Sequence, residues 1–154
     1  MNVLQEIKKE HQEFRNLILK IEKAKGDKKV SLFHDFYSKI KGHHEAEEHV
    51  VFKDVKQKSD EEGKSVVLEM IEEHSLITYQ FSLLERTSID NETWDAKFSV
   101  LKEILTHHLD EEEDEFFNQA KKVLTEQEIK DKYAPFEDTQ EKYQKDQEKK
   151  LSKK

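Results

Sequence analysis

The chain has 154 residues, enough for one ordinary domain, and 40% of them are charged against 34% that are hydrophobic. The formal net charge of −8 argues against nucleic-acid binding. No apolar run is long enough to span a bilayer or to act as a signal peptide, so we expect a cytoplasmic protein without a membrane partner. There is no Cys, which leaves His and carboxylates as the candidate ligands for a transition metal.

Four stretches carry the periodicity of amphipathic helices, and the chain has few Gly and one Pro to interrupt them. These stretches cover residues 2–25, 29–58, 60–86 and 92–123. They are separated by Gly26-Asp27, Ser59-Asp60 and the turn-rich segment 87–91. Because such short connections make neighbouring helices antiparallel, we predict an all-α, up-down-up-down four-helix bundle.

The C-terminal part has a different character. Thr125 to Glu128 has the pattern of a capping box and predicts a short further helix, which Pro135 would stop. After Phe136 the sequence is almost entirely polar and becomes Lys-rich, which predicts a frayed helix or disorder. We therefore divide the chain into a bundle domain, residues 1–125, and a polar C-terminal extension, residues 126–154.

Each long helix places a His in the middle of its apolar stripe, and two helices add a Glu one turn later. The four stripes are Leu4, Ile7, His11, Phe14, Ile18 and Ile21; Phe36, Ile40, His43, Glu47 and Val50; Val67, Met70, His74, Ile77, Phe81 and Leu84; and Trp94, Phe98, Leu101, Leu105, His108, Glu112 and Phe116. Burying isolated carboxylates is costly, and a cation between Glu47 and Glu112 would offset that cost.

The stripes also distinguish the members of the pairs His43-His44 and His107-His108. The stripe through His44 includes Lys41 and Glu48, and the stripe through His107 includes Lys97, Glu111 and Asp114, so both faces look solvent-exposed. We therefore prefer His43 and His108 as inward residues and keep His44 and His107 as alternative ligands.

Each element alone has a simpler explanation. A single core His is usually a hydrogen-bonded structural residue, and a His followed by Glu at four residues is usually an exposed helical pair. The conjunction of four inward His with two inward Glu is what favours a metal site. Six other candidates are expected at the surface: His34, His49, Glu45, Glu48, Glu111 and Glu113. Tyr79 is expected to be a packing residue.

These residues resemble the hemerythrin-like, HHE cation-binding family over most of residues 1–125. The matching segments are Glu10-His11-Gln12-Glu13-Phe14, His43 with Ala46-Glu47-Glu48 ahead of Phe52, Glu73-His74-Ser75, and His108 with Glu112 ahead of Phe117. The resemblance implies a four-helix bundle around a non-haem di-iron centre. The ligands it implies are His11 and His43 for one iron, His74 and His108 for the other, and Glu47 and Glu112 as bridging carboxylates.

Two departures separate the sequence from the oxygen-carrying hemerythrins. Those proteins have a second His one turn after the helix-three ligand, where this sequence has Thr78. They also have an Asp five residues after the helix-four His, where this sequence has Glu113, one residue after Glu112. The resemblance is therefore to a four-His, two-Glu branch, which leaves more coordination positions open.

The predicted function is a binding module whose di-iron site binds or senses O2 or NO, or stores iron. No Gly-rich phosphate loop or other substrate motif accompanies the site. The alternative is a di-iron enzyme acting on peroxide, NO or Fe(II). Iron follows from the resemblance, although Mn or Zn would also suit these ligands. The sequence identifies no protein partner.

Overall fold

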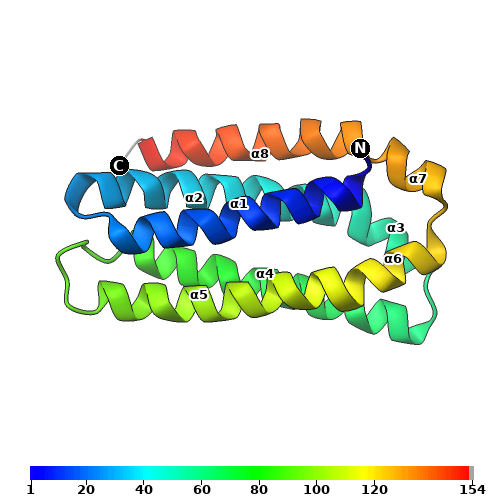
Figure 1. The fold of residues 1–154 in the computed structure, drawn as a ribbon, viewed down its shortest axis with the longest axis horizontal. Helices are drawn as coiled ribbons and strands as arrows, with labels where there is room; N and C mark the ends of the chain where they lie inside the picture. Colours follow the sequence, from blue (N-terminus) through cyan, green and yellow to red (C-terminus); the bar gives the residue numbers. More distant parts are fainter. Residues whose placement is uncertain (153–154) are drawn as a thin grey trace.

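The computed structural model describes residues 1–152, which form a helical bundle (Figure 1). Four of its helices correspond to the predicted bundle: α1 (Val3–Lys23), α2 (Gly26–Ala46), α4 (Glu61–Glu85) and α5 (Trp94–Glu111). They run alternately in opposite directions, which confirms the predicted up-down-up-down bundle (Figure 1). The last two residues of the predicted extension, 153 and 154, lie outside the described residues.

Local signals in the sequence set three of the helix boundaries. Gly26 begins α2 with φ +58°, a left-handed backbone conformation that suits glycine. Asp60 caps α4 by accepting a backbone N–H of its first turn at 3.0 Å. Thr125 and Glu128 form the expected capping box, which opens the short helix α7 (Glu126–Asp131).

Two of the predicted helices contain a π-helical turn, which the sequence pattern did not reveal. These turns are η1 (Glu47–Phe52), which joins α2 to α3 (Lys53–Lys58), and η2 (Glu112–Phe116), which joins α5 to α6 (Phe117–Val123). A π turn contains more residues than an α turn, so the inward face is shifted after it. Val50, predicted in the core, is only half-buried for this reason, and Val51 is fully buried instead.

The apolar stripes fill the bundle as two clusters. One contains Ile7, Phe52, Met70, Phe116 and their neighbours, and the other contains Phe14, Phe36, Phe81, Leu101 and theirs. Along α1 and α4, the predicted His falls between the residues of the first cluster and those of the second. The polar side chains are therefore held in a layer between two apolar layers.

The segment after Pro135 is an ordered helix, so the prediction of a frayed or disordered tail is wrong for residues 137–152. Helix α8 (Tyr133–Ser152) lies antiparallel along α2 (Figure 1). Pro135 lies in its first turn, where the missing N–H breaks no helical hydrogen bond. Phe136 and Leu151 are buried near its two ends, which is enough apolar contact for a helix that docks on an existing bundle. None of the helices within residues 1–152 has the length and apolar character needed to cross a membrane.

Candidate metal centre

The structure brings all six predicted ligand residues together in the polar layer. Each is buried, with 0–3% of its surface exposed: His11, His43, Glu47, His74, His108 and Glu112. The four His come from α1, α2, α4 and α5, and each Glu is the first residue of a π turn. π turns often occur at functional sites, so the presence of one at each inward carboxylate supports a functional role for this layer.

The orientation of each His is fixed by a carboxylate on its outer side. Nδ1 of each ring lies within hydrogen-bond distance of one Glu oxygen. The four pairs are His11 with Glu113 (2.7 Å), His43 with Glu10 (2.8 Å), His74 with Glu48 (2.8 Å) and His108 with Glu73 (2.6 Å). A carboxylate acceptor requires Nδ1 to carry the proton, so Nε2 of each ring faces the interior.

These outer carboxylates correct one prediction from the sequence. Glu48 and Glu113 were expected to be solvated, but both accept a hydrogen bond from a buried His. Each directly follows an inward Glu in the sequence, and the wide π turn holds one carboxylate inside and the next at the edge. The sequence signal was therefore the paired Glu47-Glu48 and Glu112-Glu113.

The inner atoms of the site have no hydrogen-bond partner. These buried atoms are Nε2 of His11, His43, His74 and His108, and both carboxylate oxygens of Glu47 and Glu112. Nε2 of His11 is 3.0 Å from Glu112 Oε1, yet the two atoms lack hydrogen-bond geometry. Buried polar atoms are normally satisfied. A cation among them would satisfy the whole set, so the residues fit a metal.

Electrostatics supports the same reading. Burial and the charge of Glu112 raise the pKa of Glu47 well above its ordinary range. Burial also disfavours the ionised form of Glu112, but the close approach of the Glu47 carboxyl and the His11 ring lowers the pKa of Glu112 overall. Two adjacent buried carboxylates cannot both ionise without compensation. A proton on Glu47 would supply that compensation in the metal-free protein, and a bound cation would replace it.

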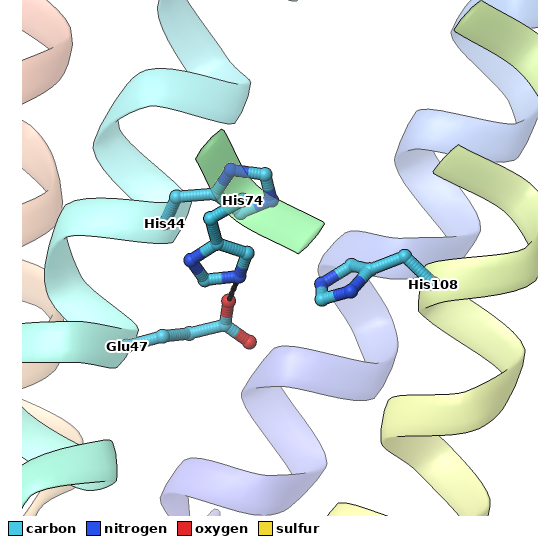
Figure 2. A group of neighbouring side chains, drawn as sticks. All are labelled: His44, Glu47, His74 and His108. Atoms are coloured by element: carbon cyan, nitrogen blue, oxygen red, sulfur yellow. Dashed lines mark ion pairs between the residues drawn. The ribbon is translucent and has the colours of Figure 1, made fainter. Parts of the chain in front are cut away.

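The ligand atoms form two groups that share one residue. The first contains His11, His43, Glu47 and Glu112, and the second contains His44, Glu47, His74 and His108; within each group the ligand atoms lie within 4.8 Å of one another. Figure 2 shows the second group: the ring of His74 lies next to the carboxylate of Glu47, the ring of His44 lies on the other side of His74, and the ring of His108 lies across from them. Glu112 also approaches the second group, since its Oε1 is 3.9 Å from Nε2 of His108. The assignment of these residues as ligands stays a prediction.

His44 does not lie on a solvent-exposed face, contrary to the interpretation of its helical stripe. It is 4% exposed, neither ring nitrogen has a hydrogen-bond partner, and burial lowers its pKa well below the ordinary value. Its ring is therefore neutral, the form that binds metals. Helix α2 is covered by the bundle on one side and by α8 on the other, so two consecutive His are both buried.

Thr78 takes no part in the site. It is exposed on α4, whereas His44 contributes a fifth imidazole from α2. The expectation that the site leaves coordination positions open stays a prediction, and the structure adds an asymmetry between the two groups. The group with His74 contains three His, and the group with His11 contains two.

Among the other ionisable candidates, Glu111 is not solvated as expected, because its side chain is only 12% exposed. It forms a third possible ligand group with Glu73 and His107. The remaining His residues are wholly or partly exposed. His107 is 74% exposed and pairs with Glu111 at 2.9 Å. His49 is exposed, and His34 is partly exposed and pairs with Glu85 at 2.9 Å. Tyr79, expected in packing, is 59% exposed instead.

Comparison with known proteins agrees with this geometry. Residues 2–120 match the family model of the hemerythrin HHE cation binding domain. The fold is similar to the crystal structure of a hemerythrin HHE cation binding domain-containing protein from Mycobacterium kansasii, with a TM-score of 0.82 and 21% identity over 95% of this chain and 89% of that one. No curated protein matches the chain. The chain therefore belongs to the hemerythrin HHE cation-binding family and forms a metal-binding helical bundle.

Proposed function

We propose that the bundle holds a non-haem di-iron centre that binds or senses O2 or NO, or stores iron. One observation carries the proposal: a buried set of imidazole nitrogens and carboxylate oxygens without hydrogen-bond partners, arranged as two groups that share Glu47. Two overlapping groups suit two ions, and nitrogen and oxygen donors suit iron, with Mn or Zn as the other fitting metals.

The two groups define how the ligands would be divided. His11 and His43 would hold one ion, His74 and His108 would hold the other, and Glu47 and Glu112 would bridge them. We add His44 to the second group because its unpartnered ring nitrogens lie among those ligands. Bound iron would supply reversible coordination of small diatomic molecules at positions that protein ligands leave open.

The chain itself provides orientation, charge balance and exclusion of water. The outer carboxylates hold each imidazole in one tautomer and make its Nε2 more basic, so that it donates its electron pair to a metal more strongly. Glu47 and Glu112 balance part of the charge of two cations. The ligand side chains are almost fully buried between two apolar clusters, so an organic substrate does not reach them in this conformation. This burial favours a small molecule as the ligand.

The proposal is tested by anaerobic loading with Fe(II), followed by exposure to air or to NO. We expect uptake of two equivalents of iron and a new visible absorption band on exposure. Uptake of iron without any new band would refute the gas-binding part and leave iron storage. Failure to retain iron, with retention of Mn or Zn, would refute the choice of metal.

A second candidate is an enzyme that turns over peroxide, NO or Fe(II). The observation in its favour is the asymmetry of the site, because the group with His11 and His43 has one imidazole fewer than the other and so more positions for a reactant. Steady-state consumption of peroxide or NO by the iron-loaded protein would support turnover. Uptake that stops after one equivalent would support binding alone.

A further inference from the structure

The outer carboxylate of His43 differs from the other three. The side chain of Glu10 is 5% exposed, whereas the side chains of Glu48, Glu73 and Glu113 are 36%, 20% and 19% exposed. Oε1 of Glu10 accepts from His43 Nδ1 at 2.8 Å, and the same oxygen accepts a second hydrogen bond, from the side-chain amide of Gln140 on α8. Helix α8 therefore reaches the candidate metal centre through two hydrogen bonds in series.

Close packing of two helices holds Gln140 in this position. Gly42 of α2 lies against α8 so closely that a Cβ atom built on it would be 2.5 Å from the backbone oxygen of Gln140. One turn earlier on α8, the ring of Phe136 meets the ring of His43 edge to face, with centroids 5.9 Å apart and planes at 84°. These contacts fix the register of α8 against α2, so the amide of Gln140 has little freedom to leave Glu10.

We propose that Gln140 is a positioning residue that fixes Glu10 and, through it, the His43 ring, so that α8 sets the metal affinity of the group containing His11 and His43. Without the amide donor, Glu10 would rotate or recruit water, and the His43 ring would lose its fixed orientation. Within residues 1–152, no hydrogen bond from α8 reaches Glu48 or Glu73, the outer carboxylates of the other group. The claim about affinity rests on the proposed function, whereas the claim about the His43 ring does not.

The first test compares Gln140→Leu with Gln144→Leu. Gln144 is one turn further along α8, also packs at Gly42 and bonds to Glu148 at 3.1 Å, so it is a matched control. Titration with Co(II) should show two binding steps. We expect Gln140→Leu to weaken one step about ten-fold and leave the other within about two-fold, because loss of an outer-shell partner typically has an effect of this size. Gln144→Leu should leave both steps unchanged.

Rescue separates the hydrogen bond from packing. Gln140→Lys keeps an N–H donor and should restore most of the affinity, whereas Gln140→Glu, which keeps the shape but replaces the donor with an acceptor, should behave like Gln140→Leu. If Gln140→Leu does not fold, the comparison of Gln140→Glu with Gln140→Lys gives the same answer. Equal weakening of both steps, or no weakening, would overturn the proposal.

The second test needs no metal. In the metal-free protein, the Nδ1 proton of His43 is buried and bonded to Glu10, so NMR should detect it as a slowly exchanging resonance far downfield. Gln140→Leu should shift this resonance and speed its exchange, while the Nδ1 resonance of His74 stays in place. An unchanged His43 resonance would refute the positioning role. Failure of the unmodified protein to bind any metal would refute the proposed function instead.

Discussion

The imidazole rings of His44 and His74 stack face to face, with centroids 3.6 Å apart and planes only 11° apart. Two positively charged imidazole rings would repel each other in this arrangement. Burial lowers the pKa of His44 well below the ordinary value, so its ring is neutral and the stack avoids that repulsion. The neutral ring of His44 lies among the possible ligand atoms of Glu47, His74 and His108. This relationship is the basis for proposing His44 as a ligand.

The first prediction concerns His44 and its exposed counterpart. From the sequence pattern alone, His44→Ala and His107→Ala should both affect metal content less than His43→Ala or His108→Ala. From the structure, we expect His44→Ala to lose about one of two metal equivalents, while His107→Ala keeps both, because only His44 is buried among the ligands. Elemental analysis of the purified variants measures this, and equal metal content in the two would contradict it.

The second prediction concerns an outer carboxylate. Glu48→Gln should lower metal affinity about ten-fold, because a neutral amide is a weaker acceptor for the Nδ1 proton of His74. Glu45→Gln is the control, since Glu45 pairs with Lys41 and His49 at the surface. Competition with a chromophoric chelator measures both affinities. The same metal affinity in the two variants would show that the hydrogen bond between Glu48 and His74 does not contribute to metal binding.

The third prediction concerns removal of the metal. At a free metal concentration about 1,000 times the Kd, binding adds about 4 kcal/mol to the free energy of unfolding. For a chain of this length that corresponds to a Tm higher by roughly 10 °C. Chelation should therefore lower the Tm, and readdition should restore it. A Tm that does not respond to the metal would show that the unpartnered atoms of Glu47 and Glu112 are satisfied in another way.

The fourth prediction concerns the pH dependence of the metal-free protein. Burial, followed by hydrogen bonding and charge from Glu10, raises the pKa of Glu6 from an ordinary 4.5 to about 8. The stability contributed by this protonated carboxyl is complete below pH 4.5 and is lost as the pH rises through 8. Between pH 6 and pH 9 the free energy of unfolding should fall by about 2–3 kcal/mol on this account.

Urea unfolding of the metal-free protein at these two pH values checks the Glu6 prediction. Glu6→Gln should remove most of the difference, because an amide does not titrate. Glu13→Gln, at an exposed position of the same helix, should leave the difference unchanged. A pH dependence that survives Glu6→Gln would assign it to another group.

The fifth prediction concerns the docking of α8. In Gly42→Ala, the added methyl group would meet the backbone oxygen of Gln140, so the two helices must separate. We expect a loss of about 1–3 kcal/mol in the free energy of unfolding, as for other overpacked contacts. Hydrogen exchange should become faster in residues 133–152 and change little in α4. Unchanged protection of α8 would contradict the backbone contact.

Periodicity predicted the layer in which the site lies because the inward face of a regular helix repeats predictably. Leu4, Ile7, Phe14 and Ile18 lie on one stripe with His11, and all are buried as expected. The same reasoning failed after Glu47, where the extra residue of the π turn moved the inward face from Val50 to Val51. A local change of helix type leaves no mark in a pattern of apolar residues.

His44 and the C-terminal helix were missed for one common reason. A helical stripe identifies one buried face, but α2 is covered on two sides, so it has no face that is wholly polar. The second cover is α8, whose polar sequence gave little sign of docking. Its contacts are made by a glycine, by two widely spaced apolar residues and by side-chain amides: Gly42, Phe136, Leu151, Gln140 and Gln147. None of these is distinctive in a sequence without its partner.

The π turns have a consequence for single-residue deletions. Loss of one residue between Glu47 and Phe52 would let α2, η1 and α3 continue as one regular α-helix, with better backbone hydrogen bonding. Glu47 and Phe52 are five residues apart, a spacing that brings two residues to the same side of a π turn, and both are almost fully buried. After the deletion they would be four residues apart, a spacing that brings them to the same side of an α-helix. The change of helix type would therefore absorb the loss of one residue, and the helix beyond the turn would keep its inward face.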